Sequence, residues 1–251
     1  MKNTERFSTK AENYVKYRPQ YPAAVIPFLV SAIGLSRDTV VADIGAGTGI
    51  SAQPFLDNGN KVYAVEPNPE MMAMAEAWLH GRPGFIPIPG TAEATTLPDA
   101  AVNLIVAATA FHWFSHEAAL KEFRRIAREN TYMVLMWNIR RSELPFEKEY
   151  EALLLQYGND YKDMQHRNVG TDRLSALFLP GTFQEKSFQN AQIFDFQAFK
   201  GRLLSSSYVP EMGAPNYEPM IQALQKLFEQ YQEQGMVRFH YETKLYIGKI
   251  K

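Results

Sequence analysis

Three glycines stand at alternate positions in a twelve-residue stretch, VVADIGAGTGIS, which opens with an apolar run ending in an acid. The glycines are Gly45, Gly47 and Gly49, and the acid is Asp43. Because glycine has no side chain, a ligand can approach the backbone closely, and the free N–H groups at the start of a following helix attract polar groups. The pattern predicts a cofactor-binding turn between a strand and a helix.

Two classes of cofactor fit this spacing: a dinucleotide, and a nucleoside cofactor that carries a positive charge. A dinucleotide fingerprint, G-x-G-x-x-A, runs from Gly47 to Ala52, so a nicotinamide dinucleotide is not eliminated. Glu66 follows Gly47 by nineteen residues, where a carboxylate can accept hydrogen bonds from both ribose hydroxyls of either cofactor. Asp43 discriminates better, because like charges repel and its carboxylate is poorly placed beside a pyrophosphate. It suits a ligand that carries an ammonium or a sulfonium group.

The elements that position these residues alternate between strand and helix. Five apolar runs predict strands, at 39–44, 61–66, 84–89, 102–107 and 132–138. Asn68-Pro69-Glu70 predicts a helix start, and Ser115 predicts the cap of a helix through Glu129. Clean alternation from Val237 to Ile247 predicts a half-exposed strand near the chain end. We expect an α/β fold: a doubly wound, Rossmann-like seven-stranded sheet, mostly parallel with an antiparallel C-terminal strand, and helices on both faces.

Composition bounds the function classes. The chain has 251 residues with 26 basic and 27 acidic side chains, a balance that gives no electrostatic argument for a nucleic-acid partner. The absence of cysteine excludes disulfides, thiolate metal sites and cysteine nucleophiles. No stretch reads as a signal peptide or a membrane span, so we expect a cytoplasmic protein with no membrane partner. The sequence does not indicate an oligomeric state.

The domain organisation is expected to be a single unit over 1–251. Within it we expect an N-terminal helical cap at 1–36, with helices over 7–17 and to about Ile33, the second bent near Pro27. The cofactor-binding core spans 37–138, and a helical insertion at 139–180 is a candidate lid. Strands and a helix at 181–251, the helix over 219–234, complete the sheet.

Five motifs in order carry a family resemblance. D-I-G-A-G-T-G followed by V-E-P-N resembles the class I S-adenosylmethionine-dependent methyltransferases. Four further segments are similar to the small-molecule branch of methyltransferase type 11 proteins that includes trans-aconitate methyltransferase-like proteins: F-S-T-K-A-E-N-Y-V-K-Y-R-P-Q-Y-P (7–22), G-T-A-E (90–93), A-F-H-W-F (110–114) and M-W-N (136–138). The resemblance is strong over 7–138 and weaker beyond.

The resemblance implies S-adenosylmethionine as the cofactor and assigns contacts to it. The three glycines would line its methionine part and ribose edge, with Asp43 near the methionine ammonium and Glu66 on the ribose hydroxyls. Adenine neighbours would be Pro67, Met71, Ala92 and Glu93, of which Glu93 accepts from the exocyclic amine. Tyr14 and Arg18 would close over the cofactor, Arg18 near its carboxylate, and the Ala108 backbone would meet the ammonium. One departure is Thr109, near which many relatives carry a glutamine.

The acceptor side is less constrained. Methyl transfer is an in-line displacement that needs alignment and no metal. Trp113 could wall the pocket, and His112 could orient or deprotonate an acceptor, although both could instead serve packing. Arg140 could clamp a carboxylate or simply be solvated, and Tyr208 could face the pocket. The sequence therefore predicts methyl transfer to a small-molecule acceptor such as a carboxylate. An NAD-type oxidoreductase and a non-catalytic S-adenosylmethionine-binding regulator stay open.

Overall fold

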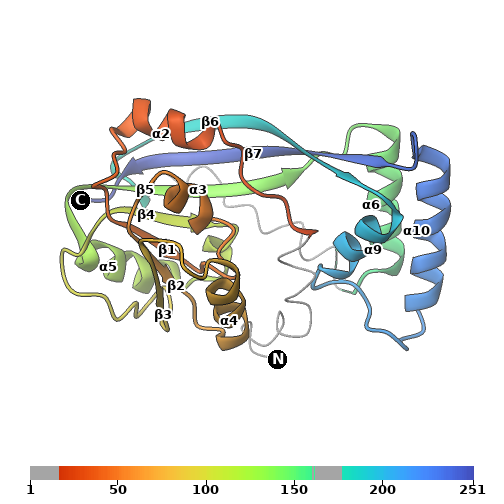
Figure 1. Ribbon diagram of the computed structural model, residues 1–251, viewed down its shortest axis with the longest axis horizontal. Helices are drawn as coiled ribbons and strands as arrows, with labels where there is room; N and C mark the ends of the chain where they lie inside the picture. The colour runs from red at the N-terminus through yellow and green to blue at the C-terminus, as the bar shows by residue number, and fades with distance from the viewer. Residues whose placement is uncertain (1–16, 160, 162–176) are drawn as a thin grey trace.

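A seven-stranded sheet organises the chain in the computed structural model, which describes residues 17–159, 161 and 177–251 (Figure 1). The strand order is β3-β2-β1-β4-β5-β7-β6. The strands are β1 (Val41–Ile44), β2 (Val62–Val65), β3 (Phe85–Ile88), β4 (Val102–Ala108), β5 (Ala127–Arg140), β6 (Leu179–Phe194) and β7 (Val237–Lys249). The first five pair in parallel, and β7 runs antiparallel to both β5 and β6. The expected mostly parallel sheet with an antiparallel C-terminal strand is confirmed.

Helices cover both faces of the sheet, as predicted. On one face α2 (Val25–Ile33) and α3 (Ala52–Asp57) pack their apolar side chains against the strands, and α5 (His116–Ile126) packs against the other face. Removal of this apolar surface from water is the main stabilisation that such layers gain. A fourth helix, α4 (Pro69–Trp78), follows β2 (Figure 1). Of the described helices, none is long and apolar enough to cross a membrane.

Local signals for helix ends were right at some positions and wrong at others. The Asn68 side chain accepts from two backbone N–H groups of α4, as predicted for an N-cap. Ser115 makes no such bond, and its backbone N–H donates instead to the Glu93 carboxylate at 2.8 Å. Helix α5 stops at Ile126 rather than Glu129, because β5 begins there and pairs with β4.

The N-terminal helices agree only in part with the sequence. Pro27 falls in the first turn of α2, where an amide N–H has no helical partner, so the expected bend has no cause. The helix expected over 7–17 lies almost wholly outside the described residues.

A second group of helices stands at the far end of the long strands from α5 (Figure 1). It consists of α6 (Pro145–Tyr157), α9 (Phe196–Leu204) and α10 (Tyr217–Tyr231), packed with one another and with β7 through a second apolar cluster. The expected helical insertion at 139–180 corresponds to α6, preceded by the end of β5 and followed by the start of β6. Residues 160 and 162–176 of it lie outside the described part.

Candidate functional site

A cavity of about 290 Å³ lies at the carboxyl edge of the sheet, far larger than the ~10–15 Å³ that a single water occupies. Loops after β1, β2 and β4, the end of β5, the segment 18–21 and helix α9 form its wall. Its lining residues include Arg18, Tyr21, Gly45, Gly47, Thr48, Glu66, Pro67, Met71, Ala92, Glu93, Ala108, Thr109, Trp113, Phe114, Asn138 and Arg202. Ligands of open α/β sheets bind at this edge.

The turn after β1 requires glycine. Gly45 has a φ of +69°, a region that residues with a side chain rarely adopt. A Cβ at this position would also lie 2.7 Å from the Cβ of Ala110. The Gly45 N–H donates to the Val65 carbonyl at 2.9 Å, which ties the turn to the end of β2. The backbone therefore forms an open cradle at the cavity wall.

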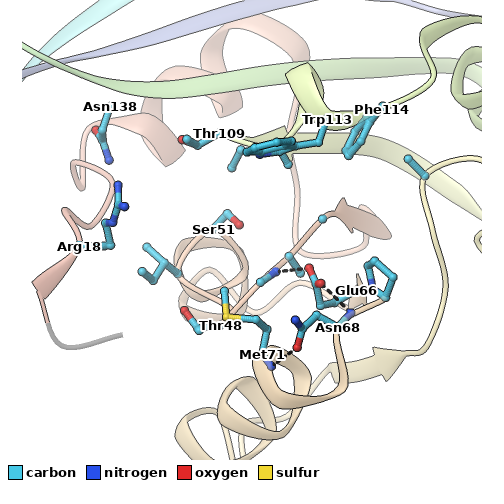
Figure 2. A pocket seen from close by; sticks show the side chains of 18 of the residues that line it. Arg18, Thr48, Ser51, Glu66, Asn68, Met71, Thr109, Trp113, Phe114 and Asn138 are labelled. Atoms are coloured by element: carbon cyan, nitrogen blue, oxygen red, sulfur yellow. Dashed lines mark hydrogen bonds between the residues drawn. The ribbon is translucent and has the colours of Figure 1, made fainter. Parts of the chain in front are cut away.

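Glu66 joins the two loops that form this side of the cavity. Its Oε2 accepts from the Gly47 N–H and its Oε1 from the Asn68 N–H, both at 2.9 Å (Figure 2). Burial raises the pKa of the carboxyl, and the two backbone N–H groups oppose that rise. Because each carboxylate oxygen can accept two hydrogen bonds, the group retains capacity for donors in the cavity.

Asp43 lies beneath the turn and is fully buried. The Ser51 hydroxyl donates to its Oδ2 at 2.7 Å, whereas its Oδ1 has no partner among the described residues. Burial raises the pKa of Asp43 to about 7, the Ser51 bond opposes the rise, and Glu66 adds to it. A buried acceptor without a donor is costly, and a cationic or N–H-bearing ligand would relieve that cost. Asp43 is not among the residues that line the cavity, so its carboxyl lies behind the glycine turn and not at the cavity surface.

Of the remaining residues that were predicted to bind the cofactor, some line the cavity and others do not. Pro67, Met71, Ala92, Glu93 and Ala108 line the cavity. Gly49 is absent from the lining, and a Cβ there would lie 2.6 Å from Leu79 Cδ1, so this glycine permits close packing of α4 against the turn. Glu93 accepts the Ser115 N–H described above, so it also holds the start of α5. Tyr14 lies outside the described residues.

The opposite side of the cavity carries Arg18 and Asn138, which lie near one another across from Glu66 and Met71 (Figure 2). The Arg18 guanidinium donates to the Ser205 carbonyl at 3.1 Å, and the Asn138 amide donates to the Pro19 carbonyl at 3.1 Å. These bonds fasten segment 17–21 to α9 and to β5.

Thr109 stands at the departure from the family pattern noted in the sequence. Its φ is +53°, which is unusual for a β-branched residue. Its hydroxyl lies 3.2 Å from that of Tyr21, so the short side chain contacts segment 17–21 across the cavity wall.

Of the residues that were predicted to contact the acceptor, only some line the cavity. Trp113 lines the cavity; His112 does not, although its ring lies 4.8 Å from that of Trp113. Arg140 forms an ion pair with Glu151, and neither Arg140 nor Tyr208 is among the described lining residues. The physical reason for the Arg140 position is that β5 continues to this residue, which carries its side chain beyond the edge of the cavity.

Several lining residues were not singled out from the sequence, and Asn138 and Arg202 are two of them. Asn138 had a signal, since it ends the fifth predicted strand inside the M-W-N motif. Arg202 had none, because it lies in a helix far along the chain and only the tertiary fold brings it to the cavity.

Comparison with known proteins gives concordant matches. The family model described as a methyltransferase domain matches residues 42–135. An uncharacterized methyltransferase of Mycobacterium tuberculosis is 32% identical over 157 residues, which is 62% of this chain and 62% of the relative. An uncharacterized methyltransferase-like protein of Schizosaccharomyces pombe is 28% identical over 155 residues, 61% of this chain and 59% of that protein. The chain therefore spans about three fifths of the length of these curated relatives.

Solved structures share the fold. A protein described as a "Putative Type II Methyltransferase" from Anaeromyxobacter dehalogenans has a TM-score of 0.67 at 23% identity, over 93% of this chain and 98% of that one. A SAM dependent methyltransferase from Aquifex aeolicus has a TM-score of 0.52 at 16% identity, over 74% of this chain and 92% of that one. Residues 42–135 therefore match a methyltransferase domain, and the chain shares the fold of these solved structures.

Proposed function

We propose that this protein is an S-adenosylmethionine-dependent methyltransferase that acts on a small molecule. The observation that carries the proposal is the glycine cradle after β1, joined through Glu66 to the loop after β2 and opening into the cavity. When bound, S-adenosylmethionine supplies a methyl group that its sulfonium has already activated. The chain then has to bind the donor, align the acceptor and exclude water.

On the cofactor side, the proposed contacts follow the geometry and the family resemblance. Glu66 accepts from the ribose hydroxyls with its remaining capacity, and Asp43, buried beneath the turn, favours the methionine ammonium by its charge. Met71 and Pro67 flank the adenine, with Glu93 at its edge. Arg18 holds the cofactor carboxylate. These assignments use the acids of the cavity for the hydroxyls and amines of the cofactor.

On the acceptor side, we propose Trp113 as a wall of the methyl-transfer pocket. A small acceptor suits a cavity of about 290 Å³ better than a macromolecule would. His112, beside Trp113, is proposed to orient an acceptor whose nucleophile carries a proton. In that role, His112→Asn removes the low-pH decline from the pH–rate profile, whereas an unchanged profile contradicts it. A carboxylate acceptor needs no such base.

The cofactor proposal is tested by thermal unfolding of the full chain with S-adenosylhomocysteine or NAD. A ligand that binds the native state raises the apparent Tm. We expect a rise with S-adenosylhomocysteine and none with NAD, and the reverse result would overturn the proposal. A screen with labelled methyl donor over carboxylates, phenols and amines then tests turnover. Cofactor binding without transfer to any acceptor would favour a non-catalytic regulator.

A further inference from the structure

Arg202 places a buried positive charge at the cavity. Its side chain is 5% exposed, and it projects from α9. Its Nε donates to the Tyr241 hydroxyl at 3.1 Å, and its Nη1 to the Ser206 hydroxyl at 3.2 Å. These partners are neutral, and no carboxylate in the described ranges forms an ion pair with it. A buried charge without a counter-charge is strongly unfavourable, so this position is suited to an anion.

Arg140, the last residue of β5, provides the contrast. It pairs with Glu151 and also donates to the Tyr161 hydroxyl at 2.9 Å, so its charge is already compensated. The surroundings nevertheless retain a positive potential. Burial opposes ionisation of Tyr208, but the nearby guanidinium groups, that of Arg140 first, outweigh it and hold the pKa of this hydroxyl below its ordinary value. Of these two arginines, Arg202 is the one that forms no ion pair with a carboxylate of the described residues.

The cavity has an acidic side and a basic side. Glu66 and Glu93 line one part, and Arg18 and Arg202 line another. Arg18 donates to the Ser205 carbonyl, and Ser205 directly follows α9, so both cations belong to the same part of the wall. S-adenosylmethionine carries one carboxylate, which matches one guanidinium. The second guanidinium has no match in the cofactor.

We propose that Arg202 anchors an oxyanion group of the methyl acceptor, so that the acceptor is an anionic small molecule. The inference rests on the proposed methyl-transfer function. Tyr241 and Ser206 fix the orientation of the guanidinium, and they leave its Nη2 without a bond to any described residue. Held in this way, the planar donor group is pre-organised for a carboxylate or a phosphate. Arg202 thus selects the acceptor by charge and need not contact the atom that is methylated.

The test uses simple anions as probes on the full chain saturated with S-adenosylhomocysteine. Malonate and inorganic phosphate are titrated in thermal unfolding, against malonamide and against NaCl at equal ionic strength. We expect at least one of the two anions to raise the Tm, whereas malonamide and NaCl do not, and the more effective anion identifies the class. Arg202→Gln should lower the affinity for that anion at least tenfold, about 1.4 kcal/mol, and leave the affinity for S-adenosylhomocysteine unchanged.

Two further variants keep the test decisive. Arg202→Lys retains the charge but loses the planar fork, so it should fold and bind the anion with intermediate affinity. Arg124→Gln removes an exposed arginine on α5 and should leave the response intact. If neither anion exceeds malonamide in the wild type, the inference is overturned although the cofactor proposal stands. If Arg202 variants lose S-adenosylhomocysteine instead, this residue binds the cofactor and the inference is again overturned. A wild-type protein that fails to bind S-adenosylhomocysteine contradicts the proposed function itself.

Discussion

Substitution of Asp43 measures how strongly burial opposes the charge of this carboxyl. Burial raises the pKa of this carboxyl from 3.8 to about 7, so ionisation destabilises the folded state relative to the unfolded chain. Asp43→Asn keeps the volume and removes the ionisation. Because Asn does not titrate, any cost of its amide to stability is the same at every pH. The pH dependence is therefore the diagnostic quantity.

The sign follows from the direction of the shift. Because the folded-state pKa is the higher one, the stabilisation from protonated Asp43 is fully present below about pH 4 and is lost as the pH rises through 7. One pH unit corresponds to about 1.4 kcal/mol, and two units separate pH 5 from the folded-state pKa. Between pH 5 and pH 8, the wild type should lose about 3 kcal/mol of unfolding free energy relative to Asp43→Asn.

Urea unfolding at several pH values, without ligand, checks this expectation. The exposed Asp38 provides the matched control, because Asp38→Asn should track the wild type across the range. Saturating S-adenosylhomocysteine should flatten the wild-type dependence, since an ammonium beside Asp43 favours its charged form. Parallel curves for the wild type and Asp43→Asn would refute the conclusion that burial raises the pKa of Asp43.

Three further predictions address the walls of the cavity. Glu66→Gln leaves one of two backbone N–H groups without an acceptor, so unfolding free energy should fall by about 1–3 kcal/mol. Calorimetry should show that this variant binds S-adenosylhomocysteine at least tenfold more weakly. An unchanged affinity would contradict the proposed contact of Glu66 with the ribose. Gly45→Ala should destabilise more than Gly34→Ala in urea, because both have φ near +70° but only Gly45 meets a neighbour; equal losses would deny a steric role. Trp113→Ala should raise the KM of the acceptor at least fivefold with cofactor affinity unchanged, and an unaltered KM would remove Trp113 from the acceptor wall.

Short-range patterns in the sequence predicted much of the fold. The glycine turn, the Asn68 cap and the alternation before Ile247 each depend on neighbours within a few residues, and the structure has the expected elements there. The parallel order of the first strands follows from the strand–helix alternation and right-handed crossovers. Ser115 shows the limit of such signals, since its predicted capping role is replaced by a contact with Glu93, twenty-two positions earlier.

The acceptor side depended on distant contacts and was therefore harder to predict. Arg140 was expected to follow the fifth strand but is the last residue of β5, and its partner Glu151 comes from a helix whose packing no local pattern specifies. Arg202 lies sixty-two positions further along and reaches the cavity because α9 packs beside β7. Periodicity identifies which face of a helix is apolar, but it does not state which strand that face will meet.

Segment 17–21 forms part of the cavity wall, and its hydrogen bonds bear on the order in which the chain can fold. Its bonds to Ser205, Gln192 and Asn190 join residues 187, 175 and 170 positions apart, and that to Asn138 spans 119. Contacts this distant in sequence form only after long loops have closed, which slows folding. The parallel strands can pair while this side of the cavity is still open. A ligand that bridges Arg18 and Glu66 would then be held only by the fully assembled chain, so its binding reports on completed folding.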